Sequence, residues 1–312
     1  MKGKFFRRFL WFLLFLFLIA NIIAFMHAYK FTHFSNSSTE RTSNHLSGFE
    51  KLKIAFTGVN NPRPINKQQP TRPFETIRIK SNKELECWFI KTDNAKGTII
   101  VFHGYAGEKS SMLDKAKQFL TLGYNTLLVD FMGCGGSQGN TTTIGFTEAQ
   151  EVRDCYEYLV KNHFQNIALF GTSMGAVAVM KAINDYNLKP KSIIIECPFG
   201  SMYQTVCKRF QMQGLPTFPM AGLLVFWGGV QNNFWAFSHN PTEYAKSIHC
   251  PTLLLYGEKD KKVSRNEINS IFQNISGLKE LVTYPLAGHE NYLSTYKEKW
   301  TNDVKSFLQV AQ

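Results

Sequence analysis

A serine flanked by glycines, between a short apolar run and a helical run, constrains this chain more than any other feature. Residues 167–170 predict a buried strand, and a Gly-Thr-Ser-Met-Gly motif follows at 171–175. The residues after it have the composition of a helix. In this strand–turn–helix context Ser173 occupies a nucleophile elbow, which exposes the hydroxyl above a helix N-terminus. Because Gly171 and Gly175 lack a Cβ atom, we expect them to let the turn close and the helix pack tightly.

Apolar runs alternate with helical patterns from about residue 74 onward. After an antiparallel pair at 75–80 and 85–91, the expected strands are 98–102, 126–129, 167–170, 193–195, 252–256 and 281–284. The expected helices are 112–122, 147–162, 174–186, 265–273 and 296–310. This alternation is typical of an α/β fold, a mostly parallel sheet with helices on both faces. Reactive groups are then expected at the C-terminal ends of the strands.

The N-terminal segment, residues 1–30, has the pattern of a membrane anchor. Four positive charges lie within residues 1–8, and the apolar run Phe9–Met26 is broken only by Asn21. That run reaches the length of a membrane span. A cleaved signal peptide is the alternative, but Met26-His27-Ala28 is a poor cleavage site. The N-terminal cations are expected to stay in the cytoplasm, which places the folded domain on the non-cytoplasmic side.

Two further segments interrupt the regular pattern. Residues 31–72 are polar and end in several prolines, as in a stalk or an arm against the domain at 73–312. Residues 201–245 separate two strands by far more than a normal connection and carry nine aromatic residues. We interpret them as a cap, in which Phe226, Trp227 and Trp235 are expected to bind substrate. The alternative is a packed helical insert without substrate contact.

Charge and cysteine patterns exclude several classes of partner. The net charge is +12, from 35 basic and 23 acidic residues. No basic run is interleaved with aromatic residues, so we expect no nucleic-acid partner. A mildly basic surface beside an anionic membrane explains the charge. None of the six cysteines lies at metal-ligand spacing, and we expect no metal and no cofactor. The sequence does not indicate an oligomeric state.

A serine nucleophile needs a base, and the base needs an orienting acid. On this type of fold the chain order is serine, acid, histidine. His289 follows the last expected strand, where a loop can bring an imidazole to Ser173. Asp260 follows the preceding strand at the apex of its loop, and Glu258 in the same loop is the second candidate.

The loop after residues 98–102 is expected to complete an oxyanion hole. Two backbone N–H groups are needed, for which Met174 and Tyr105 are the candidates. We interpret His103 in that loop as structural. The glycine-rich stretch 130–137 is not a dinucleotide site, because Gln138 fills the position of the third glycine. Asp130 is expected to hold the backbone of this loop.

Five motifs in this order carry a resemblance to a known family. They are HGYAG at 103–107, DFMGCGGSQG at 130–139, GTSMG at 171–175, YGEKD at 256–260 and AGHEN at 287–291. Together they resemble the α/β-hydrolase superfamily, most of all its monoglyceride-lipase and serine-aminopeptidase-like branch, which includes membrane-anchored hydrolases. The resemblance covers about residues 74–312 and implies an α/β-hydrolase fold with an inserted cap. Met132 departs from the pattern, which usually has arginine there.

Both lines of reasoning lead us to expect a serine hydrolase. The catalytic residues would be Ser173, His289 and Asp260, with Tyr105 and Met174 at the oxyanion. The anchor and the aromatic cap favour a small-molecule or lipid-like acyl ester as substrate. A peptidase or aminopeptidase and an acyl-thioesterase remain open with the same residues. A non-catalytic, membrane-tethered binding module on the same fold is the alternative from another class.

Overall fold

The computed structural model describes residues 2–36 and 48–311, which fall into two compact units. The larger unit comprises residues 63–201 and 239–312, and the smaller unit comprises residues 1–62 and 202–238. The part of the predicted stalk at 37–47 lies outside the described residues.

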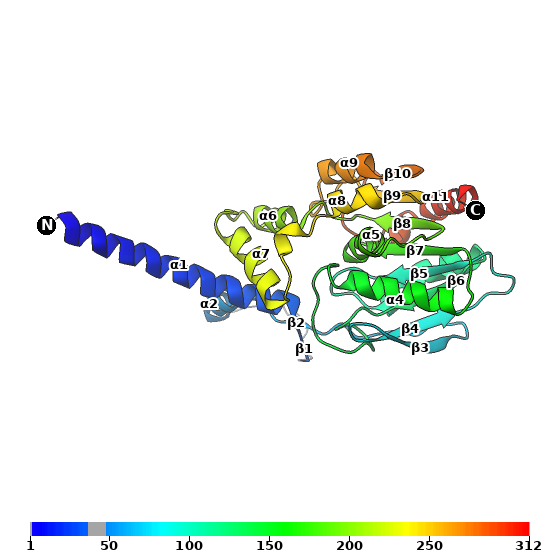
Figure 1. Ribbon diagram of the computed structural model, residues 1–312, viewed down its shortest axis with the longest axis horizontal. Helices are drawn as coiled ribbons and strands as arrows, with labels where there is room; N and C mark the ends of the chain where they lie inside the picture. The colour runs from blue at the N-terminus through cyan, green and yellow to red at the C-terminus, as the bar shows by residue number, and fades with distance from the viewer. Residues whose placement is uncertain (1, 37–47, 312) are drawn as a thin grey trace. The chain divides into compact units, whose positions relative to one another are not determined.

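A mixed sheet forms the centre of the larger unit. Within the described residues it has eight strands in the order β10-β9-β8-β7-β5-β6-β4-β3 (Figure 1). The strands are β3 (Glu75–Lys80), β4 (Glu84–Ile90), β5 (Thr98–Phe102), β6 (Asn125–Val129), β7 (Ile167–Thr172), β8 (Ser192–Glu196), β9 (Thr252–Gly257) and β10 (Lys279–Tyr284). β4 pairs antiparallel with β3 and β6, and the other neighbours are parallel. The predicted α/β fold class is therefore confirmed.

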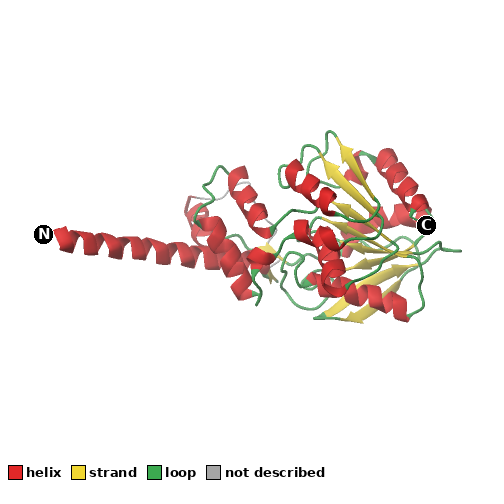
Figure 2. Cartoon of the chain, turned by 45° about the horizontal axis from the view of Figure 1, so that its top comes forward, coloured by secondary structure: helices red, strands yellow, loops and turns green. Residues whose placement is uncertain are grey.

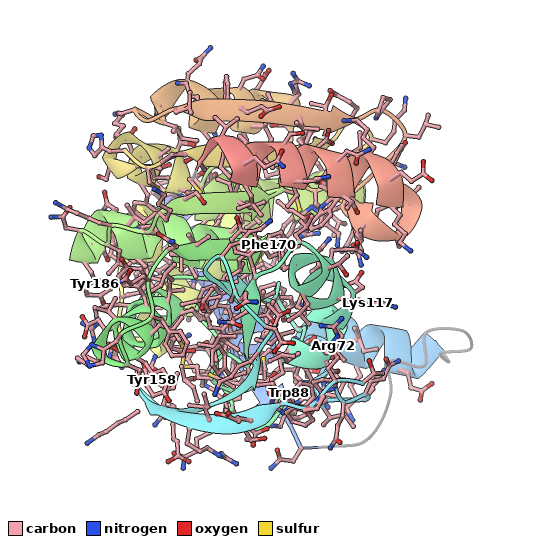
Figure 3. The ribbon with its side chains drawn as sticks, turned by 90° about the vertical axis from the view of Figure 1, so that its right-hand side faces the viewer. Arg72, Trp88, Lys117, Tyr158, Phe170 and Tyr186 are labelled. Carbon is pink, nitrogen blue, oxygen red and sulfur yellow. The ribbon has the colours of Figure 1, made fainter. Side chains whose placement is uncertain are left out.

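Helices cover both faces of this sheet. The principal helices are α3 (Leu113–Thr121), α4 (Glu148–Lys161), α5 (Met174–Tyr186), α9 (Arg265–Asn274) and α11 (Lys297–Val310). Figure 3 shows Tyr158 of α4 and Tyr186 of α5 on one side of the sheet and Lys117 of α3 on the other. The predicted strands and helices of this unit end within two residues of the observed ones.

The core between α3, α11 and the sheet follows the alternation of the strands. Ile99 and Val101 of β5 and Phe170 of β7 point into one buried cluster with Phe119 of α3 and Trp300 of α11. Successive strand residues face opposite sides, so every second residue of β5 reaches this cluster. Short helical turns complete the unit: η1 (Lys109–Met112), α8 (Pro241–Tyr244), η3 (Ala245–Ser247) and α10 (Tyr292–Thr295).

The smaller unit is mostly helical (Figure 2). Its elements are α1 (Lys2–Thr32), β1 (Phe34–Ser35), α2 (Gly48–Thr57), β2 (Asn61–Pro62), α6 (Met202–Met212), α7 (Met220–Gln231) and η2 (Ala236–Ser238). β1 pairs parallel with β2. Over Gly3–Thr32, α1 is long and apolar enough to cross a membrane by length and composition. The N-terminal segment therefore has the helical form that an anchor requires.

Residues 63–72 belong to the larger unit. The Arg63 guanidinium donates hydrogen bonds to the carbonyls of Gly139 and Ser137, and Asn66 Nδ2 donates to Asp130 Oδ2 at 2.8 Å. Residues 63–72 of the predicted stalk therefore form an ordered arm that holds the glycine-rich loop.

The predicted cap at 201–245 is divided between the units. Residues 202–238 lie in the smaller unit, and residues 239–245 pack in the larger one. His239 is fully buried there, with its Nε2 atom 3.0 Å from Ile144 O and its Nδ1 atom 3.1 Å from Tyr244 Oη. Burial lowers the pKa of His239 to about 4. The neutral, buried imidazole of His239 and its two hydrogen-bond partners anchor the chain in the larger unit at this residue. From here on, "the insert" means residues 202–238.

Candidate active site

Ser173 stands at the junction of β7 and α5 in a strained backbone conformation. Its φ of 52° and ψ of −113° lie outside the regions that residues with a side chain prefer. Two backbone hydrogen bonds fix the turn: Ser173 N–H donates to Glu196 O at 2.8 Å, and Val177 N–H donates to Ser173 O at 3.1 Å. The turn therefore projects the hydroxyl at the start of α5, as the elbow motif predicted.

The two glycines beside Ser173 allow this close packing. A Cβ atom on Gly175 would lie 2.5 Å from Phe102 O, and one on Gly171 would lie 2.5 Å from Ala176 N. Both distances are shorter than the contacts that real Cβ atoms make. The predicted need for glycine at these positions is confirmed.

The structure brings Ser173, His289 and Asp260 together in a hydrogen-bonded chain. His289 Nε2 lies 3.0 Å from Ser173 Oγ, and His289 Nδ1 lies 2.7 Å from Asp260 Oδ2. The three side chains follow β7, β10 and β9, so they meet at the C-terminal edge of the sheet. An imidazole with Nδ1–H bound to a carboxylate leaves Nε2 free to accept the hydroxyl proton.

Asp260 is held in one orientation by its own loop. Its Oδ1 atom accepts hydrogen bonds from the backbone N–H groups of Lys262 at 2.7 Å and Val263 at 3.0 Å. The carboxylate is fully buried, and its Oδ2 atom is left for His289. Glu258, the second candidate, is instead partly exposed and forms an ion pair with Arg265. The geometry thus distinguishes the two carboxylates of this loop.

Charges around His289 favour its protonated form. Burial disfavours the charged ring, but the Cys197 sulfur and the Asp260 carboxylate outweigh it and raise the pKa of His289 above its ordinary value. Cys197 is a buried free cysteine directly after β8, and its backbone has a positive φ of 41°. This neighbour of His289 was not identified from the sequence.

Cys197, Asp260 and His289 also form a group that could hold a metal ion. Their ligand atoms lie within 4.8 Å of one another, a set found in the described part of the chain. An ion at this position would compete with Ser173 and Asp260 for the imidazole nitrogens.

The loop after β5 lies against the elbow. A Cβ atom on Gly104 would be 3.4 Å from Thr172 O and 3.6 Å from the Ser173 Cβ atom. Tyr105, the next residue, and Met174, the first residue of α5, are the predicted oxyanion donors. His103 is fully buried and structural, as predicted: its Nε2 atom accepts from Phe131 N–H at 3.1 Å, and Nδ1 lies 2.8 Å from Gly104 O.

Asp130 ties the glycine-rich loop to the loop that carries Tyr105. Its carboxylate accepts from Gly136 N–H at 2.8 Å and from Lys109 N–H at 2.6 Å, and it forms a buried ion pair with Lys109 Nζ. The prediction that Asp130 holds loop backbone is confirmed. Lys109 was not predicted, because a lysine in a polar loop gives no sign that it will be buried.

A second buried network joins the elbow to the loop of His289. Glu196 Oε2 accepts from Thr172 Oγ1 at 3.1 Å, and Glu196 Oε1 accepts from Lys115 Nζ at 3.1 Å and Trp300 Nε1 at 2.7 Å. Lys115 Nζ also donates to Asn291 Oδ1 at 2.7 Å. Asn291 stands two residues after His289, so this network connects the residue before Ser173 with the histidine loop.

The three predicted substrate-binding residues lie in the smaller unit. Trp227 packs edge-on against Phe25 with ring centroids 5.2 Å apart, while Phe226 and Trp235 are exposed. The structure does not bring these side chains together with Ser173 in one compact unit. Their role toward a substrate remains a prediction.

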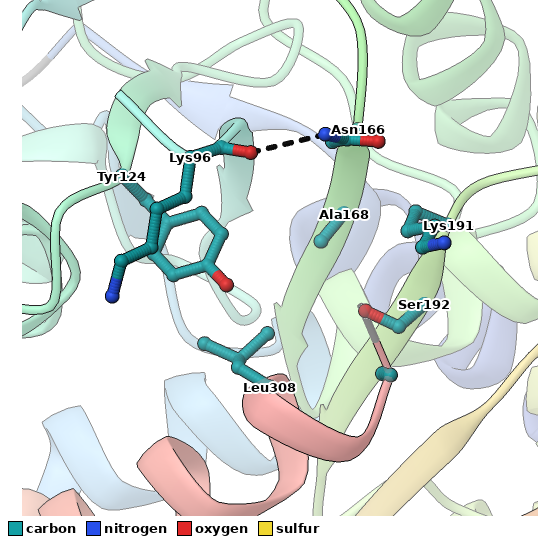
Figure 4. Close-up of a pocket in the computed structure, with 8 residues that line it drawn as sticks. Lys96, Tyr124, Asn166, Ala168, Lys191, Ser192 and Leu308 are labelled. Atoms are coloured by element: carbon teal, nitrogen blue, oxygen red, sulfur yellow. Dashed lines mark hydrogen bonds between the residues drawn. The ribbon is translucent and has the colours of Figure 1, made fainter. Parts of the chain in front are cut away.

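A cavity of about 300 Å³ lies in the larger unit, away from Ser173 (Figure 4). It opens where β5, β7 and β8 begin, at the N-terminal edge of the sheet. Its lining residues are Lys96, Tyr124, Asn166, Ala168, Lys191, Ser192, Leu308 and Ala311. Since Ser173, His289 and Asp260 lie at the C-terminal edge, this cavity is not part of their site.

The sheet order, the serine after β7, and the aspartate and histidine after β9 and β10 together define an α/β-hydrolase fold. Residues 93–243 match the family model described as serine aminopeptidase, S33. The resemblance seen in the sequence motifs is confirmed.

Individual proteins show the same relationship. The uncharacterised protein YqkD of Bacillus subtilis is 24% identical over 229 residues, which cover 72% of this chain and 75% of that protein. Lysophosphatidylserine lipase ABHD12 of Danio rerio is 25% identical over 203 residues, covering 62% of this chain and 51% of that protein. Among solved structures, the Pyrococcus furiosus esterase Pf2001 has a TM-score of 0.68 at 23% identity, covering 80% of this chain and 97% of that chain. At this identity, the structural likeness establishes the fold.

Proposed function

We propose that this protein is a serine hydrolase that cleaves carboxylic esters with hydrophobic acyl groups. The observation that carries the proposal is the hydrogen-bonded chain from Ser173 Oγ through His289 to Asp260, with distances of 3.0 and 2.7 Å. A bonded serine, imidazole and buried carboxylate in this order is the arrangement that activates a hydroxyl as a nucleophile.

The reaction would proceed through an acyl-enzyme. Ser173 Oγ attacks the substrate carbonyl carbon while His289 Nε2 takes the hydroxyl proton. The oxyanion that forms is held by the N–H groups of Met174 and Tyr105. His289 then gives its proton to the departing alcohol, and a water molecule repeats the sequence on the acyl-enzyme. Asp260 keeps Nδ1–H of His289 in place and stabilises the imidazolium.

The preference for a hydrophobic acyl group rests on the chain's apolar segments. Helix α7 of the insert and α1 are both apolar, and one relative is a lysophosphatidylserine lipase. The name of the matching family model favours an aminopeptidase as the second candidate. Both reactions use the same attack on a carbonyl, so the two candidates differ in substrate and share the proposed residues.

The proposal is tested with a fluorophosphonate probe on the full-length protein. We expect covalent labelling of wild type and its complete loss in Ser173→Ala, because the probe reacts only with an activated serine hydroxyl. Ser306→Ala is the matched control, since Ser306 is exposed on α11 and should leave labelling unchanged. Labelling that persists in a folded Ser173→Ala variant would contradict the assignment.

A substrate panel then separates the two candidates. Linear acyl esters of increasing chain length are compared with aminoacyl amides and acyl thioesters at equal concentration. We expect the highest kcat/KM for an ester. Faster cleavage of aminoacyl amides would favour the aminopeptidase, and labelling without turnover of any class would leave a binding module.

A further inference from the structure

The smaller unit contains a second apolar helix, α7, beside α1. The sequence of α7 has no charged residue. Across the whole insert the charged residues are Lys208 and Arg209, both on α6. An insert with two cations and no acidic residue has a composition suited to an anionic lipid surface.

Specific contacts hold α7 against α1 (Figure 1). Trp227 Nε1 donates a hydrogen bond to Asn21 Oδ1 at 3.1 Å, and Gln231 Nε2 donates to Phe25 O at 2.9 Å. Phe25 and Trp227 also meet edge-to-face. The polar side-chain donors of α7 are thus directed toward α1, which leaves apolar groups for the outside.

The contacted residues lie within the apolar span of α1. A bilayer core is about 30 Å thick, or about 20 helical residues. If the cations before Phe9 stay at one headgroup layer, the core extends from Phe9 to about residue 28. Asn21 is then about 18 Å into the core at 1.5 Å per residue, and Phe25 about 24 Å. Both positions lie about 6 to 12 Å inside the second boundary.

Asn21 supports this placement. It is the one polar residue in the run Phe9–Met26. An amide in hydrocarbon is unfavourable unless it is hydrogen-bonded, and such residues commonly join two helices. Here Asn21 Nδ2 donates to Phe17 O at 2.9 Å, and Oδ1 accepts from Trp227. The polar residue in the span is therefore the one that binds the insert.

Because of the direction of α7, its first residues lie deeper in the bilayer than Trp227 and Gln231. The two hydrogen bonds pair residues 21 and 25 of α1 with residues 227 and 231 of α7, so both helices run in the same sense. Earlier residues of α7 lie toward earlier residues of α1. The turn before α7 carries Phe218, which is 85% exposed, and Leu215, which is also exposed. Exposed apolar side chains at this end would reach furthest into the core.

We propose that α7 and the turn before it are the membrane-embedded part of the insert. α7 lies beside α1 within the hydrocarbon core of the bilayer, and Phe218, Leu215 and Val230 contact lipid acyl chains there. The occupant of this apolar face is the bilayer that holds α1. The proposal is independent of the chemistry at Ser173 and requires that α1 lie in the membrane.

The test uses the full-length protein in liposomes of phosphatidylcholine and phosphatidylglycerol. Cys207 and Cys250, the two cysteines that are not buried, are first changed to serine. A single environment-sensitive fluorophore is then attached after Phe218→Cys. Leu13→Cys on α1 serves as the positive control, and Lys305→Cys on α11, at an exposed position, as the aqueous control. Each sample is quenched separately with a nitroxide on the lipid acyl chain and with iodide in the buffer.

We expect the probe at 218 to behave like the probe at 13: strong quenching by the lipid nitroxide, loss of iodide quenching and blue-shifted emission. The probe at 305 should show the reverse. Iodide quenching at 218 would overturn the proposal, and so would protection from both quenchers, which would mean that protein or a second copy covers the site. Absence of lipid quenching at 13 would overturn its premise. Fluorophosphonate labelling of the same samples reports separately on the hydrolase assignment.

Discussion

Replacement of Asp260 by asparagine tests the proposed mechanism most sharply, because the structure determines how the amide must be oriented. Asp260 Oδ1 accepts hydrogen bonds from two backbone N–H groups, those of Lys262 and Val263. In Asp260→Asn the carbonyl oxygen of the amide must take that place, since the NH₂ group cannot accept. The NH₂ group then faces His289 Nδ1.

An amide donor at Nδ1 selects the wrong tautomer. His289 would carry its proton on Nε2, where it can no longer accept the proton of Ser173. In a related arrangement the loss is about 10⁴-fold in kcat. At about 1.36 kcal/mol per factor of ten, this corresponds to about 5.4 kcal/mol of transition-state stabilisation. We expect the same magnitude here because the Asp260 carboxylate is also buried.

The assay is kcat/KM for a chromogenic acyl ester together with the rate of fluorophosphonate labelling. Glu258→Gln is the matched control, because Glu258 lies in the same loop but pairs with Arg265. Its activity should stay close to wild type, and the melting temperatures of both variants should show that they fold. An Asp260→Asn variant within about tenfold of wild type, or a more damaged Glu258→Gln variant, would refute the reasoning.

Four further predictions concern pH, substrate and the N-terminus. Since Cys197 and Asp260 raise the pKa of His289, kcat/KM should rise with pH around a midpoint above about 6.5, the ordinary histidine value, and a midpoint at or below that value in a pH–rate profile would contradict the geometry. The same raised pKa means that protonated His289 stabilises the fold below about pH 6.5, and urea titrations should show this contribution lost as pH rises through the folded pKa. For linear esters, kcat/KM should rise with acyl chain length, and each added CH₂ should lower the activation free energy by at most about 0.8 kcal/mol. Phe226→Ala or Trp235→Ala should reduce this rise. A flat series in all three proteins would mean that these aromatic residues do not bind the acyl chain. Mass spectrometry of membrane-extracted protein should find the N-terminal peptide still attached, with the larger unit protease-accessible from the non-cytoplasmic side, whereas a mature N-terminus near Lys30 would indicate a cleaved signal.

Local sequence pattern was sufficient to predict the sheet and its helices. Strands such as Ile167–Thr172 are continuous apolar runs because helices cover both faces of the sheet, and such runs are easy to locate between amphipathic helices. The order of Ser173, Asp260 and His289 follows from where parallel strands end. The backbone topology alone therefore predicts that these side chains meet at one edge of the sheet.

The supporting groups could not be predicted in the same way. Glu196, Lys115 and Asn291 come from three separate segments, and each is of a residue type that is usually found on the surface. In the sequence, Cys197 resembles any buried hydrophobic residue at the end of a strand. It comes to lie beside His289 only because β9 and β10 pair next to β8 in the sheet. The end of the insert at residue 238 was also missed, because the partners of His239 include Ile144, far away in sequence.

The hydrogen bond between Asn21 and Trp227 joins residues that are 206 positions apart. Ribosomes add about 5 to 20 residues per second, so Trp227 is synthesised about 10 to 40 s after Asn21. During that interval an inserted α1 must hold the Asn21 side-chain oxygen within the bilayer without its Trp227 donor. Biogenesis of this protein would thus pass through a stage in which α1 is vulnerable to pairing with other membrane helices. Synthesis of α7 ends that stage by supplying the missing donor from the same chain.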